Sequence, residues 1–401
     1  MKNIHKFVKI ILRFFVSILG VILLGLLIPY LLNPVYRFLP TEVFSGNLFY
    51  NPYSQIDSTL WKRCNFHAHC RAWGGITDGG NSPQKNVLSA YKEMGYDYAG
   101  ISNYQKINIL SNHPQGFIPS YEHGFNIKKR HHLVLGADRV SWLDFFFWQN
   151  LNHKQFVINN LQRDADFLII NHPQFEESFL PSDFSSLSNY DAIEVLNHYR
   201  TSVSHWDSAL SSGYYTFLSA NDDMHDLYNV QEMGKCLTLI NTQSTDRQSI
   251  ISTLRKGTYL GIKMSEQENE TFPMRTQRLK KLPYPLKINM KGDTIELQMN
   301  QIVNQISFIG QNGILKKEVT NSDTAIYIFS NKDTYIRIEI RDKEDNLLLF
   351  NPIARTKTPV IIPPQRAEIN IFCTTVKYAV ETILILLLTM VLVRWRKKKI
   401  K

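Results

Sequence analysis

Two apolar runs near the ends of the chain restrict the folds that are open to it. Residues 14–36 contain no charged side chain, and residues 378–395 form a second run whose only charged residues are Glu381 and Arg394. A helix needs about 20 mostly apolar residues to cross a bilayer. We therefore expect transmembrane segments at residues 14–36 and 378–395.

Each run has an alternative interpretation. The first could be a cleaved signal peptide, but only a weak small-residue cleavage site follows it, at residues 43–46. The second could be an amphipathic helix on the membrane surface, but residues 382–393 offer no polar face. We favour an uncleaved anchor at the first run and a second span at the other.

The net charge of +10 comes entirely from the two ends of the chain. Four basic residues precede the first run and six follow residue 393, without any acid among them, so residues 14–393 are formally neutral. A neutral body does not favour nucleic-acid binding. Because basic tails stay in the cytoplasm, we expect tails at residues 1–13 and 396–401 inside the cell. The chain is then a two-pass protein of the cell membrane with an extracytoplasmic body, periplasmic in a two-membrane bacterium.

The four cysteines are too few for a disulfide framework. Cys64 and Cys70 lie on one expected strand, where six residues would hold them too far apart for a bridge unless the strand ends sharply at His69. Cys236 has the surroundings of a buried apolar residue, and Cys373 borders the second span.

Between the spans the periodicity changes once. Short apolar runs alternate with helical stretches in residues 61–265, which is typical of a parallel α/β sheet or barrel. Residues 283–360 instead alternate apolar and polar side chains, which predicts a small antiparallel, sandwich-like β domain. The remaining segments, which we expect to be linkers, are residues 37–60, 266–282 and 361–377.

Histidines and carboxylates follow several of the expected strands. His67 and His69 are one residue apart and share a face of an extended chain, and Asp223 and His225 repeat this spacing. The carboxyl ends of parallel barrel strands meet at one face, and imidazole with carboxylate suits Zn, Mn or Fe. Further candidates after strands, each of which could also be an ordinary loop residue, are Asp138 and His172.

The order of these motifs resembles that of the PHP (polymerase and histidinol phosphatase) phosphoesterases. The likeness covers residues 61–265 well and 283–355 weakly. It rests on Asn-Phe-His-Ala-His at 65–69, residues 95–104, Gly-Ala-Asp at 136–138, Asn-His-Pro at 171–173, residues 191–197, and Asn-Asp-Asp-Met-His at 221–225. The resemblance implies a distorted (β/α)7 barrel that holds up to three metal ions and hydrolyses phosphate esters. It implies these ligands: His67, His69, Asp138, His172, Asp223 and His225.

Two departures from the family pattern affect the expected metal count. Asn103-Tyr104 replaces an Asp-His pair, and Asp138 stands where a glutamate is usual. The centre is therefore expected to hold one to three divalent ions. Replacement imidazoles could come from His113, His123 or His198.

The resulting hypothesis is a membrane-anchored phosphoesterase that uses metal-activated water. Asp223 is the expected catalytic residue, which orients the water. Arg71 and Arg200 are expected to contact the phosphate oxygens, or else to form surface salt bridges. The alternatives are a catalytically silent PHP-like module that binds a ligand or partner, favoured by Asn103-Tyr104, and an amidohydrolase-like hydrolase.

Overall fold

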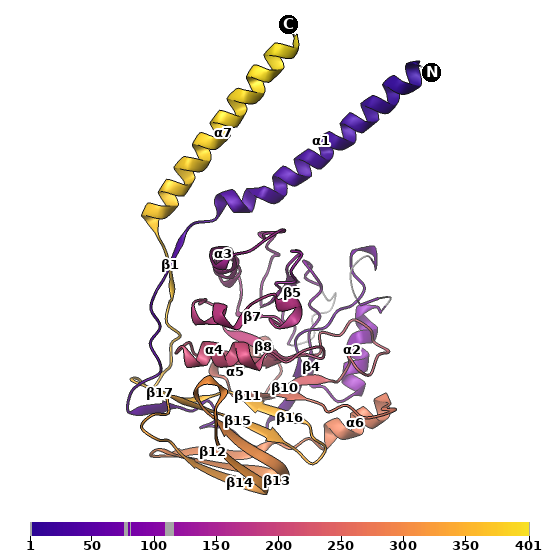
Figure 1. The fold of residues 1–401 in the computed structure, drawn as a ribbon. Coiled ribbons are helices and arrows are strands. Elements are labelled where there is room, and N and C mark those ends of the chain that lie inside the picture. Colours follow the sequence, from indigo (N-terminus) through magenta and orange to yellow (C-terminus); the bar gives the residue numbers. More distant parts are fainter. Residues whose placement is uncertain (1, 76–78, 81, 109–115, 401) are drawn as a thin grey trace.

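The computed structural model describes residues 2–75, 79–80, 82–108 and 116–400, with the backbone alone for residues 2–6 and 398–400. Two long helices stand on the same side of a mixed α/β body (Figure 1). This agrees with the expected fold class of an α/β body flanked by two terminal apolar helices.

A five-stranded sheet forms one half of the body. Its order is β5-β6-β7-β8-β9, and β7, β8 and β9 run parallel, whereas β6 runs antiparallel to both β5 and β7. All five strands are buried, and β6 to β9 are mostly apolar, as is usual for strands covered on both faces, whereas β5 is Ser-Tyr-Glu-His. Their bounds are Ser120–His123, His132–Leu135, Phe167–Ile170, Ala192–Leu196 and Phe217–Ala220, and the connecting helices are α3 (Leu151–Gln162) and α4 (Val203–Ser211).

A larger sheet continues from the first strands of the body into the C-terminal region. Strand β3 (Trp61–Asn65) pairs with β4 (Tyr98–Ala99) and β10 (Cys236–Asn241), and β10 pairs with β11 (Tyr259–Lys263). The sheet continues through β16 (Leu347–Phe350), β15 (Tyr335–Arg341), β13 (Thr294–Ile309) and β12 (Pro285–Lys291), with β14 (Leu315–Ile328), β17 (Ile353–Thr356) and β2 (Leu48–Tyr50) off this path.

This continuity differs from the two separate bodies that the change of periodicity suggested. Leu260 of β11 lies opposite Phe350 of β16, so backbone hydrogen bonds join the two regions. Helix α6 (Phe272–Lys280) occupies the expected linker at 266–282. Among the described residues, isolated bridges join the two sheets at Ala68–Met224 and Tyr104–Glu122, and the strand pairings do not form one closed barrel.

The strand that carries the first histidines ends sooner than expected. Strand β3 ends at Asn65, and the next residues are held by single bonds: Asn221 Oδ1 accepts from the Phe66 amide, and the His67 carbonyl accepts from the Asp223 amide. All four cysteines are free, and Cys64, Cys70 and Cys236 are buried. The two remaining body helices are α2 (Gln84–Glu93) and α5 (Arg247–Lys256).

The terminal helices α1 (Lys2–Leu32) and α7 (Ile371–Ile400) contain apolar segments long enough to cross a membrane, Phe7–Leu32 and Ile371–Lys397. Neither segment is buried by the rest of the protein. The expected linkers are partly ordered here, because β1 (Tyr36–Phe38) pairs with β18 (Ala367–Ile369). Lys377 of α7 joins the two helices, because its Nζ donates to the carbonyls of Tyr30 and Leu31 in the last turn of α1. Cations at helix C-termini are favourable.

Candidate metal centre

The candidate site lies at one edge of the five-stranded sheet, where several chain segments converge. His67 and His69 follow β3, Glu122 lies in β5, His172 follows β7, and Asp223 follows β9. His131 precedes β6 and reaches the same edge because β6 runs in the opposite direction, with His132 opposite Ile170. Strand direction therefore selects which end of each strand supplies a side chain.

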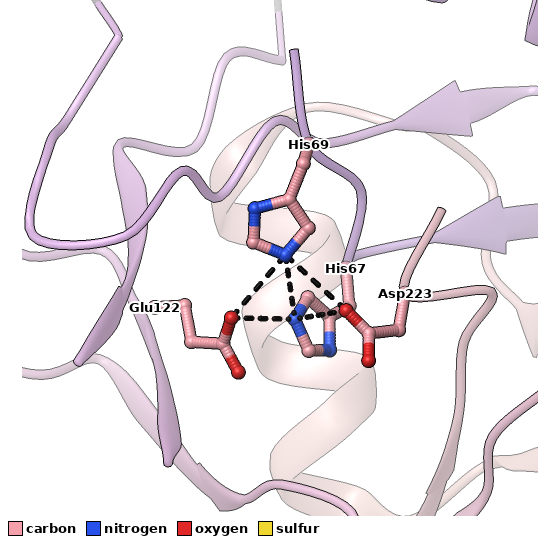
Figure 2. Close-up of side chains that lie close together, drawn as sticks. All are labelled: His67, His69, Glu122 and Asp223. Atoms are coloured by element: carbon pink, nitrogen blue, oxygen red, sulfur yellow. Dashed lines mark hydrogen bonds and ion pairs between the residues drawn. The ribbon is translucent and has the colours of Figure 1, made fainter. Parts of the chain in front are cut away.

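Four side chains surround one point in the first group (Figure 2). The Nε2 atoms of His67 and His69 are 3.3 Å apart. Glu122 Oε2 is 3.3 Å from His67 Nε2 and 3.2 Å from His69 Nε2, and Asp223 Oδ1 is 3.1 and 3.2 Å from the same two nitrogens. All four residues are at least 95 % buried.

Five of the six separations between these donor atoms are thus 3.1–3.3 Å. A tetrahedral site with Zn–N and Zn–O bonds of about 2.0 Å places its donors about 3.3 Å apart, so these five separations are compatible with one ion. Two imidazoles and two carboxylates are also the donor types that Zn, Mn and Fe take. The first group therefore fits a single divalent ion.

A second group shares Glu122 with the first. Glu122 Oε1 is 3.0 Å from His131 Nδ1 and 3.3 Å from His172 Nε2, and all three residues are buried. One carboxylate thus faces a different set of imidazoles with each oxygen. Paired metal ions in hydrolytic sites lie about 4 Å apart, which a bridging carboxylate can span.

Buried residues behind the groups hold the ligands in place. Glu194 Oε1 lies 3.0 Å from His67 Nδ1, which leaves Nε2 of that ring free to face the centre. Asn197 Nδ2 donates to Glu194 Oε2 at 3.0 Å and to Asp223 Oδ2 at 3.2 Å. His172 and Asp223 adopt positive φ angles of 25° and 50°, a strained backbone typical of functional sites.

Electrostatics bind the groups together even without an ion. Burial lowers the pKa of His69, but hydrogen bonds and charge interactions with Asp223 and Glu122 outweigh it and raise the pKa to about 9. Burial likewise opposes charge on Glu122, but His67 and His131 outweigh it and hold the pKa of this carboxyl well below its usual range. The pKa of Asp223 is lowered in the same way, by His67 and His225. Protonated histidines therefore face ionised carboxylates across the point that a cation would occupy.

The structure brings together four of the six ligands expected from the sequence: His67, His69, His172 and Asp223. His225 lies beside them, with its ring 4.3 Å from that of His69 and its Nδ1 2.8 Å from the Asp223 carbonyl, but it belongs to neither group. Its role as a ligand remains a prediction.

Asp138 must be corrected. Its side chain is exposed and it belongs to neither group. The sequence argument placed the end of the strand before Asp138 at the site, which holds for parallel strands. Because β6 is antiparallel to β7, that end lies at the opposite edge of the sheet, and Glu122 supplies the carboxylate.

Sequence reasoning missed Glu122 and His131. The signal available in the sequence was a glutamate inside the short run between Pro119 and Gly124. In the structure all four residues of this run are buried, and a buried charge is unfavourable unless it has a partner. No local pattern distinguishes His131 from its neighbour His132, which faces Phe179 at a ring distance of 5.8 Å.

The two arginines expected to contact phosphate are exposed. Arg200 Nη1 donates to the Tyr199 carbonyl at 3.1 Å, and the Arg71 amide donates to the Ser82 carbonyl at 2.9 Å. Contact of either guanidinium group with a substrate remains a prediction.

The residues that depart from the PHP pattern have other partners. Asn103 Oδ1 accepts from the Cys70 amide, and the Tyr104 ring lies 4.8 Å from His69. His123 Nε2 lies 3.0 Å from the Leu143 carbonyl, and His198 Nδ1 contacts the Asp222 carbonyl. Within the described residues only the two groups above could hold metal. His113 lies outside the described residues.

No family model and no curated protein matches the chain. A two-domain protein from Bacteroides vulgatus, described as containing a predicted PHP-like metal-dependent phosphoesterase, is similar over 79 % of this chain and 99 % of its own, with 13 % identity and a TM-score of 0.41. PsfC from Pseudomonas syringae is similar over 55 % and 98 %, with 14 % identity and a TM-score of 0.35. The chain itself is an α/β protein with a buried histidine–carboxylate cluster.

Proposed function

We propose that this protein is a metal-dependent phosphoesterase whose two metal groups share Glu122. The observation that carries the proposal is the placement of the two Glu122 oxygens, one facing His67 and His69 and the other facing His131 and His172. A pair of divalent ions at such a site supplies hydroxide at neutral pH and neutralises charge on a phosphoryl group.

The protein side chains have distinct roles in this proposal. His67, His69, Glu122 and Asp223 hold the first ion, and His131 and His172 hold the second together with Glu122. Asp223 also orients the attacking water, because its Oδ2 stays outside the first group and is fixed by Asn197. Arg71 and Arg200 contact the phosphate oxygens, and His225 lies at the edge where substrate enters, since its side chain is 29 % exposed.

We further propose that α1 and α7 cross the cell membrane. Their apolar segments are unburied and project from the same side of the body (Figure 1), so both basic tails would end in the cytoplasm. The body and its metal centre would then work outside the cytoplasm, on a phosphate ester found there.

A metal and activity measurement tests the proposal. The full chain is purified in detergent, its Zn, Mn and Fe contents are measured, and hydrolysis of an aryl phosphate monoester and diester is followed with each metal. We expect at least one metal equivalent and a turnover that is lost in His67→Gln. The control His205→Gln removes another buried histidine, which contacts the Phe179 carbonyl rather than either group. Metal below one equivalent and no turnover would contradict the proposal.

A second candidate function is a silent module that binds a phosphorylated ligand. Asn103-Tyr104 favours it, because these residues replace metal-ligating types in the PHP pattern and are here engaged with Cys70 and His69. Metal uptake that depends on His67, without turnover of either ester, would support this function.

A further inference from the structure

A segment of the body rich in aromatic residues lies between the end of the first apolar helix and the metal centre. Residues 141–149, here called the aromatic loop, have the sequence Ser-Trp-Leu-Asp-Phe-Phe-Phe-Trp-Gln. The side chains of Trp142 and Trp148 are 60 % and 59 % exposed. Two largely exposed tryptophans in one loop of nine residues leave apolar surface in water, and exposed apolar surface of this kind marks interaction sites.

One end of the aromatic loop is fixed to α1. The Tyr30 hydroxyl donates to the Trp148 carbonyl and accepts from the amides of Phe147 and Trp148, each at 3.0 Å. The Tyr30 ring lies 4.7 Å from that of Trp148 and 5.0 Å from that of Phe145. Tyr30 belongs to the last turn of the apolar segment Phe7–Leu32, so this end of the loop lies where that helix would leave the membrane.

The other end of the loop reaches the metal centre. The Trp142 ring lies 6.2 Å from that of Trp73, which is itself 45 % exposed. Trp73 Nε1 donates to the Tyr104 carbonyl at 2.8 Å, and the Tyr104 ring lies 4.8 Å from the ring of His69. A short series of direct contacts therefore connects the end of the membrane helix to a proposed metal ligand.

A neighbouring loop adds positive charge. The Ile127 amide donates to the Phe146 carbonyl at 3.0 Å, and Ile127 is 59 % exposed. Lys128 and Lys129 follow it and are exposed. This loop begins after Glu122 and ends at His131, so it connects two proposed ligands directly. Aromatic side chains beside lysines suit the headgroup region of a bilayer that contains anionic lipids.

We propose that the aromatic loop lies in the bilayer interface and that the metal centre acts on a phosphate ester carried by a membrane lipid. Tryptophan favours this zone because its ring is apolar and its N–H is polar. The loop would hold the edge of the site at the membrane surface, where the phosphate of a lipid headgroup is found. The substrate class rests on the proposed phosphoesterase function, whereas the contact with the bilayer does not.

Fluorescence quenching tests the contact. The full chain is reconstituted into vesicles of phosphatidylcholine and phosphatidylglycerol, with part of the phosphatidylcholine brominated near the headgroup. Bromine quenches only nearby tryptophans, so Trp148→Phe should lower the quenchable fraction of the fluorescence. The control Trp61→Phe removes a half-buried tryptophan of β3, so the absolute amount of quenched fluorescence should stay the same and the quenchable fraction should not fall. Equal quenching with and without Trp148 would overturn the contact and indicate a protein partner for the loop.

A rate comparison tests the substrate class. Hydrolysis of phosphatidic acid in the same vesicles is compared with hydrolysis of a soluble aryl phosphate. Trp142→Ser with Trp148→Ser should lower the ratio of the two rates by about tenfold, since interfacial binding scales with buried apolar area. The matched control is Ile326→Ser with Ile328→Ser, which are 51 % and 68 % exposed in β14, at the end of the body away from the helices (Figure 1). It should leave the ratio unchanged.

The two failures are distinguishable. If neither ester is hydrolysed, the proposed function and the substrate class fall together, while quenching still decides the membrane contact. A second outcome is that the soluble ester is hydrolysed while the tryptophan double variant and the isoleucine double variant give the same ratio of lipid to soluble hydrolysis. In that case the phosphoesterase function stands and the lipid-borne substrate is wrong.

Discussion

Among the described residues, two sets of buried carboxylates have different partners: those of the candidate metal centre and those paired with arginine. In the metal centre, Glu122 and Asp223 face histidines. Between α4 and β15, Asp207 is held by Arg337, whose Nε and Nη2 donate to its two oxygens at 2.7 and 2.8 Å. Glu270 is held in the same way by Arg275, with a further bond from Arg278.

This difference in partner indicates which buried acids can bind a cation. Arginine stays protonated and satisfies both oxygens of a carboxylate, so an arginine-paired acid is complete as a structural element. Histidine can lose its proton and turn a lone pair toward a metal. The same kind of buried acid therefore serves structure where arginine is its partner, and belongs to a candidate cation site where histidines are.

The largest expected effect comes from removing the shared acid. Glu122→Gln keeps the size of the side chain but removes the negative charge that both groups use. Metal content should fall in both groups, and hydrolysis should fall by more than about 100-fold, the upper effect seen for outer partners of metal ligands. Metal analysis and aryl phosphate turnover measure these effects. Retention of both metals would contradict this role and show that Glu122 is no more than a structural acid.

Breaking an arginine pair should affect stability instead. Arg337→Ala leaves Asp207 buried without its cationic partner, with only the Tyr335 hydroxyl at 3.5 Å among the described side chains, which costs about 3–5 kcal/mol of the free energy of unfolding. Urea unfolding in detergent with a chelator measures this cost. The control Arg341→Ala removes an exposed pair with Asp345 and should cost less than about 1 kcal/mol. A cost for Arg337→Ala as small as that of the control would show that the pair is not a structural element.

Glu194 is a third kind of buried acid, because it contacts the proposed ligand His67 but belongs to neither metal group. Glu194→Gln weakens the partner of His67 Nδ1, and such outer partners contribute about 10–100-fold to metal affinity. Competition with a chromophoric chelator measures the change. An affinity equal to that of the unchanged protein would mean that other contacts orient the His67 ring.

The ion pairs of Glu270 with Arg275 and Arg278 should also weaken in acid. Burial raises the pKa of Glu270, but Arg275 and Arg278 outweigh it and lower the pKa below its usual value. The pair therefore contributes its full stability above the unfolded pKa of about 4.5 and loses it as the pH falls through the lower folded value. Urea midpoints at decreasing pH, with a chelator present, should fall less steeply in Glu270→Gln. Parallel curves for the two proteins would contradict this.

The smallest effect is expected at Asp138. Its exposed side chain lies outside both groups, so Asp138→Ala should leave metal content unchanged and change turnover and stability by less than about twofold, as for ordinary surface positions. A loss of metal in this variant would restore Asp138 as a ligand and break the assignment of Glu122.

Much of the site could be predicted because several of its residues carry local sequence signals. His67 and His69 share a face of an extended chain, and His172 and Asp223 each follow an apolar run that forms a strand. The sequence favours Asp138 because it follows an apolar run, whereas Glu122 lies in the strand Ser-Tyr-Glu-His, which has no apolar pattern. The pairing of β6 decides between them, and pairing depends on residues far away along the chain.

Sequence alone was enough to locate the apolar end segments, the alternation of strands and helices, and the His67–His69 pair, because each depends on neighbouring residues. Only the tertiary structure decided three further features: the direction of β6, the joining of the C-terminal strands to β11, and the meeting of His131 with Glu122. These depend on backbone hydrogen bonds and charge contacts between distant segments, which no local pattern specifies.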